Sequence, residues 1–388
     1  MNAPSCPPGI GNAALESAFG SYTALLSATT AFWTGALARQ ASPADLAMDF
    51  LDWSATVSRR DRPQWASENQ IVANWPIARL RDFSIGDTTD QIPTLLLPPQ
   101  AGHDSCIVDF ASGQSQVGTA REVGLTRVFS LDWIGATPET KHASIEDYVA
   151  VIHETIEQLG GRVNLVGDCQ GGWLATIYAA LYPQSIHTLT VAGAPIDFHA
   201  GNPLIFDWMK VLAPAHDLAF YRQLVDRNDG SLPGEYLLGG FIAMQPDVEL
   251  SRQLQLLAHI NEPEHVARYR QFETWFKHTQ PIPGAFYLWI VENLFQNNKL
   301  ISGELVIGDR TVQLSDISCP LYLVAGITDH ITPPQQVFAL ADHASTEASQ
   351  VDKRLVESGH LGLFMGHESL RNHWAPIFTE LAKVSAES

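Results

Sequence analysis

Six short, apolar, β-rich segments recur along the chain, and each of them ends at a turn. They are residues 94–97, 128–131, 163–166, 189–191, 321–325 and 354–356. Helical patterns such as those at 145–159 and 173–181 lie between them. Apolar strands that alternate with helices are typical of a mostly parallel, doubly wound sheet with helices on both faces. The sequence therefore predicts an α/β protein.

Length and composition indicate how the chain is divided. With 388 residues, of which 45% are hydrophobic, the chain is long enough to bury one sizeable core. We expect a helical segment at residues 1–73, followed by one α/β domain at 74–388. Within that domain the strand pattern disappears between about 198 and 300, where aromatic residues are frequent. An insertion at this point is expected to form a helical cap over the carboxyl ends of the strands.

The N-terminal segment contains an uncharged stretch, residues 18–38, that is long enough to span a membrane. Six serine and threonine hydroxyls dilute its hydrophobicity. Leu25, Ala28, Phe32 and Ala36 share one face at helical spacing. We therefore predict an amphipathic helix packed on the body of the protein, and no transmembrane segment. The alternative is an interfacial helix that rests on a lipid or polymer surface.

Charge and cysteine usage exclude several classes of protein. The 42 acidic and 23 basic residues give a net charge of −19, which repels phosphate backbones and disfavours nucleic-acid binding. Cys6, Cys106, Cys169 and Cys319 form no CxxC pair and no cluster with histidine, so no metal or organic cofactor is indicated. Scattered thiols, and the absence of Lys and Arg from residues 1–9, favour a cytoplasmic location.

The strongest chemical signal is the sequence Gly-Asp-Cys-Gln-Gly-Gly at residues 167–172. It has the form of a nucleophile elbow, G-x-S-x-G, with cysteine in the place of serine, and it follows an apolar strand and precedes a helical pattern. The sharp turn exposes the nucleophile, and the glycines let strand and helix backbones approach each other. We predict that Cys169 is the nucleophile and that the Gln170 amide faces the developing oxyanion. The alternative is a buried cysteine at a tight turn.

The acid and the base of such a site follow the nucleophile in chain order. Asp329 comes directly after the fifth apolar segment, and His360 follows the sixth. We expect His360 to act as the base and Asp329 to orient its imidazole. His330 is the rival histidine, and Asp352 and Glu357 are weaker rivals to the acid.

A second oxyanion donor is expected from the loop that follows the first apolar segment. The two prolines at the start of this loop, residues 98–105, have no N–H to donate. The backbone amides of Gln100, Ala101 and Gly102 are therefore the candidates that would act with that of Gln170. For each of these residues the alternative is an ordinary glycine turn.

These segments resemble the polyhydroxyalkanoate synthases and the intracellular polyhydroxyalkanoate depolymerases, related cysteine enzymes of the α/β-hydrolase fold. The resemblance runs from roughly residue 74 to residue 374. It rests on the Gly-x-Cys-x-Gly-Gly box at 167–172, on Asp-His and Pro-Pro pairs within 329–334, and on Gly-His-x-Gly at 359–362 with a later Trp-x-Pro at 374–376. The resemblance implies that Cys169 carries the acyl group and that Asp329 and His360 complete the triad.

The resemblance also implies a function. We expect a synthase-like acyltransferase that polymerises (R)-3-hydroxyacyl-CoA through an acyl-cysteine. The implied partners are hydroxyacyl-CoA or a polyhydroxyalkanoate chain, the surface of a polymer granule, and a second copy or a synthase partner subunit. The alternative is a depolymerase that hydrolyses poly-3-hydroxybutyrate or its oligomers with the same triad. A granule-bound structural protein without activity is disfavoured, because nucleophile, acid and base are all present.

Three features depart from the synthases. After the tryptophan that corresponds to Trp275, synthases usually have Asn and Asp, whereas this chain has Phe-Lys-His at residues 276–278. The Ala-Gly-His loop at 101–103 looks more like the depolymerases. Asp168 places a carboxylate beside Cys169, where a neutral residue is usual, and its charge is expected to oppose formation of the thiolate.

Overall fold

A computed structural model describes residues 8–86, 91–201, 203–213 and 217–386 of the chain. Cys6 and the other residues of the segment 1–7 lie outside these residues. The chain forms two compact units. The helical unit consists of Met1–Pro63 and Glu235–Thr279, and the α/β unit consists of Gln64–Gly234 and Gln280–Ser388.

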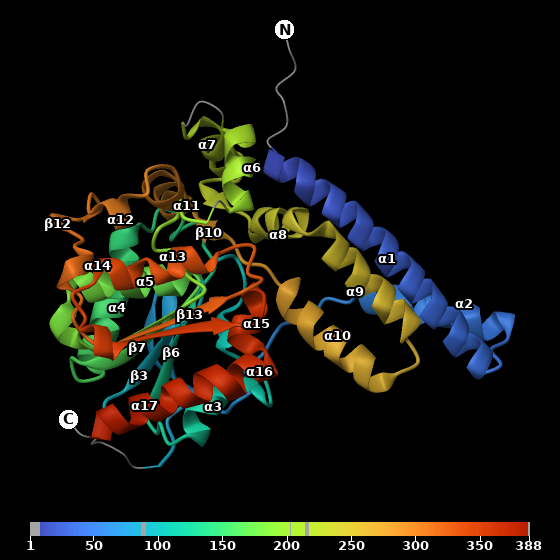
Figure 1. Ribbon diagram of the computed structural model, residues 1–388, viewed down its shortest axis with the longest axis horizontal. Helices are drawn as coiled ribbons and strands as arrows, with labels where there is room; N and C mark the ends of the chain where they lie inside the picture. Colours follow the sequence, from blue (N-terminus) through green and yellow to red (C-terminus); the bar gives the residue numbers. More distant parts are fainter. Residues whose placement is uncertain (1–7, 87–90, 202, 214–216, 387–388) are drawn as a thin grey trace, which may run out of the picture. The chain divides into compact units, whose positions relative to one another are not determined.

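The α/β unit is built on an eight-stranded sheet with the strand order β1-β2-β6-β3-β7-β8-β13-β14 (Figure 1). The strands β1 and β2 pair antiparallel, as do β2 and β6, and the other pairs are parallel. The strands are β1 Gln70–Trp75, β2 Ala78–Asp82, β3 Thr94–Leu97, β6 Val128–Trp133, β7 Val163–Asp168, β8 Ile186–Ala192, β13 Leu321–Gly326 and β14 Val351–Val356. Each of the six predicted segments lies within one of the parallel strands, so these predictions are confirmed.

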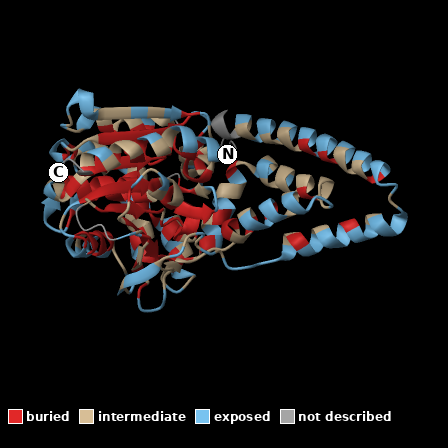
Figure 2. Cartoon of the chain, turned by 90° about the horizontal axis from the view of Figure 1, so that it is seen from below, coloured by how far each residue is buried: buried red, intermediate tan, exposed pale blue. Residues whose placement is uncertain are grey.

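Helices cover both faces of this sheet. Figure 1 shows α3 and α17 together on one face, with α4 and α5 on the other. The helices that follow the strands are α3 Gln116–Glu122, α4 Ile145–Gln158, α5 Gln170–Leu181, α13 Pro334–Phe338, α14 Leu340–His343, α15 His360–Met365, α16 His367–Ser369 and α17 Ala375–Ala386. Every residue of β3, β6, β7 and β13 is buried, and Figure 2 shows the buried residues concentrated along the strands. This mostly parallel, two-sided sheet confirms the predicted fold class, the α/β-hydrolase fold.

Short elements complete the α/β unit. Three two-stranded ribbons pair β4 Asp109–Ala111 with β5 Gln114–Ser115, β9 Ser231–Leu232 with β10 Ile282–Pro283, and β11 Val306–Ile307 with β12 Arg310–Thr311. Short 3₁₀ turns are η1 Ser105–Val108, η2 Pro183–Ser185, η4 Leu314–Asp316 and η5 Ala348–Gln350, and π-helical turns are η3 Val291–Gln296 and η6 Leu370–Trp374. The β9–β10 ribbon lies where the sequence pattern showed no strand.

The stretch from 198 to 300 is mostly helical, as its pattern predicts. Its helices are α6 Leu204–Leu212, α7 Ala219–Asp226, α8 Gly234–Met244, α9 Pro246–Ala258, α10 Pro263–Phe276, α11 Gly284–Ile290 and α12 Lys299–Ser302. The helices α6, α7, α11 and α12 belong to the α/β unit, where Ala213, Leu218, Tyr221 and Val291 form a small hydrophobic cluster. The helices α9 and α10, and nearly all of α8, belong to the helical unit. A cap over the strands' carboxyl ends remains a prediction.

The helical unit also contains α1 Pro8–Ala38 and α2 Pro43–Ser58. Within it α1 runs along α9 (Figure 1). Ala24, Ala28 and Ala36 are buried, whereas Leu25 is half exposed, so the predicted apolar face is wrong at Leu25. The buried stripe of α1 is made of small side chains, which let two helices pack closely. Among the described residues, no helix combines the length and the hydropathy that a membrane span requires.

A buried carboxylate connects three parts of the helical unit. Asp49 on α2 is buried, and its Oδ2 accepts a hydrogen bond from Arg39 Nη2 at 2.5 Å. Its Oδ1 accepts a second hydrogen bond from Asn261 Nδ2 at 2.9 Å, in the turn between α9 and α10. Since a buried charge is costly without partners, these two contacts fix the end of α1 and the α9–α10 turn against α2.

Replacing Asp49 with alanine removes the common partner of Arg39 and Asn261. We expect Asp49→Ala to lower the free energy of unfolding by about 2–3 kcal/mol. The control is Asp52→Ala, at an exposed position on the same helix, which should change that energy by less than about 0.5 kcal/mol. Urea unfolding followed by circular dichroism measures both. Equal effects of the two substitutions would contradict the role of Asp49.

Candidate active site

Cys169 lies at the turn between β7 and α5, the position predicted for a nucleophile. Its backbone has φ +50° and ψ −117°, a conformation that residues other than glycine rarely adopt. The Cys169 N–H donates to the Ala192 carbonyl at 2.8 Å, and the Cys169 carbonyl accepts from the Gly172 N–H at 2.9 Å. The side chain is partly exposed. Such a turn presents the sulfur at the carboxyl end of β7, as a nucleophile elbow requires.

Three glycines make this turn sterically feasible. A Cβ atom on Gly167 would overlap the backbone of Gly171, and a Cβ atom on Gly171 would overlap the Leu97 carbonyl. A Cβ atom on Gly172 would overlap the side chain of Ala194. The strand that precedes Cys169 and the helix that follows it therefore approach each other more closely than side chains permit.

The structure brings His360 and Asp329 together at the carboxyl ends of neighbouring strands. Asp329 follows β13, and His360 is the first residue of α15, just after β14. His360 Nδ1 lies 2.7 Å from Asp329 Oδ2. Because an ionised carboxylate only accepts, His360 Nδ1 carries the proton. Asp329 Oδ1 accepts the backbone N–H groups of Ile331 and Thr332, each at 2.9 Å, which fixes the carboxylate in place.

His360 also forms a hydrogen bond with the side chain of Cys169. Burial by itself would lower the pKa of His360, but the negative charges of Asp329 and of a Cys169 thiolate hold this pKa well above its usual value. Burial would raise the pKa of Asp329, but the His360 charge and the two backbone amides hold it below its usual value. Asp329 and the Cys169 side chain thus favour the protonated form of the His360 imidazole.

The two other described cysteines are poor nucleophiles. Burial raises the pKa of the Cys319 thiol to about 12, and it raises the pKa of the Cys106 thiol further. Both therefore remain protonated at neutral pH, and a thiol is far less reactive than a thiolate.

The rival residues lie in different surroundings. Burial lowers the pKa of His330, so this half-buried imidazole is neutral at pH 7, whereas the Asp329 hydrogen bond goes to His360. Asp352 lies on β14 and pairs with Arg354 at 2.6 Å, and Glu357 is exposed. Of these candidates, His360 is the histidine that is hydrogen-bonded both to Cys169 and to Asp329. The catalytic roles of the three residues remain predictions.

The predicted oxyanion donors lie close to the turn at Cys169. Gln170 is the first residue of α5, and the backbone carbonyls of Leu97 and Pro98 pack against Gly171. Ala101 is buried in the loop that follows β3, and Gly102 adopts φ +81°. This loop is therefore adjacent to the elbow, and oxyanion binding by the Gln170, Ala101 and Gly102 amides remains a prediction.

Four aromatic side chains pack together behind the first turn of α5. The rings of Tyr148 and Phe286 stack with centroids 4.0 Å apart, and Trp173 lies 6.2 Å from Phe286. Trp133 lies 5.2 Å from Tyr148, and its Nε1 donates to the Pro98 carbonyl at 2.9 Å. The cluster thus connects α5 and α11 to the loop that follows β3 and makes the surroundings of the elbow rigid.

Asp168 is a buried acid, and its charge differs from the one expected from the sequence. Its Oδ2 accepts a hydrogen bond from Gln116 Nε2 at 2.8 Å, and its Oδ1 has no hydrogen-bond partner among the described residues. Burial raises the pKa of Asp168 to about 8, although the Gln116 hydrogen bond and the His360 charge oppose the rise. At neutral pH the side chain is therefore mostly uncharged, and the expected repulsion of the Cys169 thiolate is largely removed.

Gln116 also contacts the helix that carries His360. The same Nε2 that donates to Asp168 lies 3.4 Å from the carbonyl oxygen of Phe364. Phe364 belongs to α15, the helix that begins with His360, and its ring meets the imidazole edge-on at 5.2 Å. Gln116 therefore connects the strand that carries the nucleophile to the helix that carries the histidine.

The raised pKa of Asp168 has a consequence for stability. Between the ordinary pKa of 3.8 and about 8, the folded protein binds more protons at this residue than the unfolded chain does. The contribution of Asp168 to stability is therefore present at low pH and is lost as the pH rises through about 8. Asp168→Asn keeps a side chain of the same shape that is uncharged at every pH. Near pH 9 we expect its free energy of unfolding to exceed that of the wild type by an amount on the order of 1–3 kcal/mol.

Urea unfolding at about pH 5, pH 7 and pH 9 measures this difference. The control Asp316→Asn changes an exposed carboxylate and should follow the pH dependence of the wild type. Parallel curves for Asp168→Asn and the wild type over the whole pH range would show that Asp168 is charged in the folded protein.

The amino-acid sequence is similar to those of several proteins named as polymerase subunits. It is 26% identical to the poly(3-hydroxyalkanoate) polymerase subunit PhaC of Allochromatium vinosum over 61% of this chain and 66% of that one. It is 25% identical to the subunit of that name from Haloferax mediterranei over 89% and 70%. For Synechocystis sp. the identity is 27% over 69% and 73%. The chain thus matches about two thirds of the length of these curated relatives.

A structure from a study of carboxylesterases of Nitrososphaera gargenis has the same fold. It is 14% identical, with a TM-score of 0.50, and the match covers 82% of this chain and all of that one. A family model described as "Protein of unknown function (DUF3141)" matches residues 72–386. Since this match covers most of the chain, the protein belongs to the family of that description.

Proposed function

We propose that the protein is an acyltransferase that resembles the polyhydroxyalkanoate polymerases and transfers 3-hydroxyacyl groups through Cys169. The observation that carries this proposal is a cysteine at the elbow, in hydrogen-bond contact with an imidazole that a buried carboxylate orients. The relatives are named as poly(3-hydroxyalkanoate) polymerase subunits, which supports the choice of substrate.

In the first step the enzyme accepts the acyl group. His360 takes the thiol proton of Cys169, and the thiolate attacks the carbonyl carbon of a 3-hydroxyacyl-CoA thioester. The Gln170 amide and an amide of the loop at Ala101 and Gly102 stabilise the oxyanion. When the tetrahedral intermediate collapses, the carbon–sulfur bond to CoA breaks, and the CoA sulfur takes the proton from His360. One thioester replaces another, so this step is nearly isoenergetic.

In the second step the acyl group moves to a growing chain. The terminal hydroxyl of the chain gives its proton to His360, and its oxygen attacks the acyl carbon on Cys169. The new ester bond forms, the bond to sulfur breaks, and the thiolate regains its proton or returns to its pair with the imidazolium. Asp329 holds the imidazole in the required tautomer and stabilises its cation in both steps. Because a thioester is more activated than an ester, the transfer is favourable.

Hydrolysis is the second candidate, and the loop that follows β3 favours it. The loop at Ala101 and Gly102 resembles the depolymerases, and Gln280 fixes it through hydrogen bonds to the carbonyls of Gly102 and His103, each at 2.9 Å. In this reaction the thiolate attacks an ester bond of the polymer, and the chain hydroxyl leaves with the proton from His360. Water then replaces the chain hydroxyl as acceptor in the second step and releases a 3-hydroxy acid. Both reactions pass through the same acyl-cysteine and differ in the acyl donor and the acceptor.

The proposed substrate suggests where the protein acts and with what. A polymer chain grows or is shortened at the surface of an insoluble granule, so the proposal includes binding to that surface. The relatives are named as subunits, and we therefore include a second copy or a separate partner subunit in the proposal.

The test follows the products of two reactions. One contains (R)-3-hydroxybutyryl-CoA with a thiol reagent that detects free CoA, and the other contains amorphous poly-3-hydroxybutyrate. We expect CoA release with accumulation of polymer in the first reaction. Cys169→Ala should lower the rate by at least about 1,000-fold, because the covalent path is lost.

Cys319→Ala is the matched control, since this half-buried thiol stays protonated, and it should retain the activity of the wild type. Release of free 3-hydroxybutyrate without polymer would establish the hydrolase instead. If wild type and Cys169→Ala give identical products, the assignment of Cys169 as the nucleophile is wrong.

A further inference from the structure

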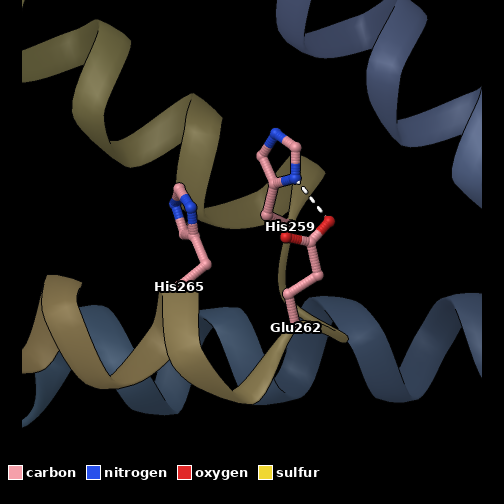
Figure 3. A group of neighbouring side chains, drawn as sticks. All are labelled: His259, Glu262 and His265. Atoms are coloured by element: carbon pink, nitrogen blue, oxygen red, sulfur yellow. Dashed lines mark hydrogen bonds and ion pairs between the residues drawn. The ribbon is translucent and has the colours of Figure 1, made fainter.

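Three metal-ligating side chains meet at the turn between α9 and α10, within the helical unit. His259 follows the last residue of α9, Glu262 precedes the first residue of α10, and His265 lies in the first turn of α10. One ligand atom of each residue lies within 4.8 Å of those of the other two. Figure 3 shows the three side chains gathered on one side of the turn. The cysteine and histidine spacings in the sequence predicted no metal, and none of these three residues lies near a cysteine in the chain.

The backbone of the turn holds the three residues in this arrangement. The Glu262 N–H donates to the His259 carbonyl at 2.9 Å, and the Val266 N–H donates to the Glu262 carbonyl at 3.0 Å. Pro263 occupies the first position of α10, where its fixed φ favours the start of a helix. The spacing of the ligands is therefore set by a hydrogen-bonded turn and does not depend on chance contacts between side chains.

The His259 side chain contacts both of the other two side chains. His259 Nδ1 lies 2.7 Å from Glu262 Oε1, and the rings of His259 and His265 lie side by side with centroids 4.8 Å apart and planes 27° apart (Figure 3). Glu262 is exposed and the two histidines are half buried, so solvent and ions have access to the cluster.

We propose that His259, Glu262 and His265 form a binding site for a divalent transition-metal ion of the Zn²⁺ class. Two imidazole nitrogens and one carboxylate oxygen are a ligand set that this class of ion accepts. Bonds of about 2.0–2.2 Å place neighbouring ligand atoms about 3.3–3.5 Å apart. The widest separation in the cluster, up to 4.8 Å, therefore closes when an ion binds, and the His259–Glu262 contact of 2.7 Å opens. The fourth position is left to water.

The ion has a structural consequence for the helical unit. It connects the end of α9 to the start of α10, next to Asn261, whose side chain contacts Asp49 on α2. Because the ion binds the folded turn and not the unfolded chain, it stabilises this unit by mass action. The site therefore does not depend on the function proposed for Cys169.

The experiment titrates the full chain, freed of metal by a chelator and of any affinity tag, with Co²⁺. We expect one equivalent to bind and to give the strong visible absorption of four-coordinate Co²⁺, which Zn²⁺ then displaces. Zn²⁺ should also raise the unfolding temperature of the wild type. Removal of a ligand should weaken binding by at least the roughly 10- to 100-fold that loss of an outer-sphere partner costs.

The variants are His259→Ala, His265→Ala and Glu262→Gln, with His142→Ala as the control at an exposed histidine of the α/β unit. We expect the first three to lose the cobalt absorption and the thermal stabilisation, and His142→Ala to keep both. Circular dichroism of the chelator-treated variants shows whether they fold. The proposal is overturned if excess Co²⁺ gives no spectral change in the wild type. It is equally overturned if folded variants bind as the wild type does, or if a thiolate-to-cobalt band shows that a cysteine holds the ion.

Discussion

The direct turn from β7 into α5 holds Cys169 at positive φ, and the rest of the site depends on that conformation. A residue with a side chain remains there only because the surroundings fix it, through backbone hydrogen bonds to Ala192 and Gly172. The two backbones come so close at Gly167 and Gly171 that a Cβ atom at either residue would collide with a neighbouring backbone. The strain is offset by the buried sheet, whose central strands have no exposed residue.

Given this turn, the electrostatics of the site follow from which groups are buried and which are paired. His360 is buried next to Asp329 and Cys169, whose interactions with the imidazole favour its charged form. Asp168 is equally buried but has an amide as its one hydrogen-bond partner among the described residues, and so its neutral form is favoured. The two carboxyl groups on either side of the reacting pair thus differ in charge because their partners differ: Asp329 stays ionised to hold the imidazole, while Asp168 fills space beside Cys169 with little charge.

The sequence was sufficient to predict the parallel core, for a physical reason. Strands buried on both faces must be apolar throughout, so they stand out as short runs. The antiparallel edge was missed, because β1 and β2 face solvent in part and Arg79 and Arg81 interrupt the apolar pattern of β2. The choice between His330 and His360 rested on chain order, and the 2.7 Å contact with Asp329 now supports it geometrically.

Other features depend on contacts that no local pattern encodes. The neutral state of Asp168 follows from burial and from Gln116, which lies 52 residues away in the chain. The buried stripe of α1 contains alanines but not Leu25, which was predicted to lie in it, because α9 packs against α1 and is far away in the sequence. By contrast, the spacing of His259, Glu262 and His265 can be read from the sequence. That the three residues share one turn follows only from where α9 ends and α10 begins.

If Cys169 carries the acyl group, as proposed, the acyl-enzyme can be isolated. Purified protein is mixed with (R)-3-hydroxybutyryl-CoA, quenched in acid within the first turnover, digested with pepsin and mapped by mass spectrometry. We expect a 3-hydroxybutyryl group on the peptide that contains Cys169, which neutral hydroxylamine removes as it removes thioesters. An acyl group on Cys106 or Cys319, or turnover without any acyl-cysteine, would show that Cys169 is not the acyl carrier.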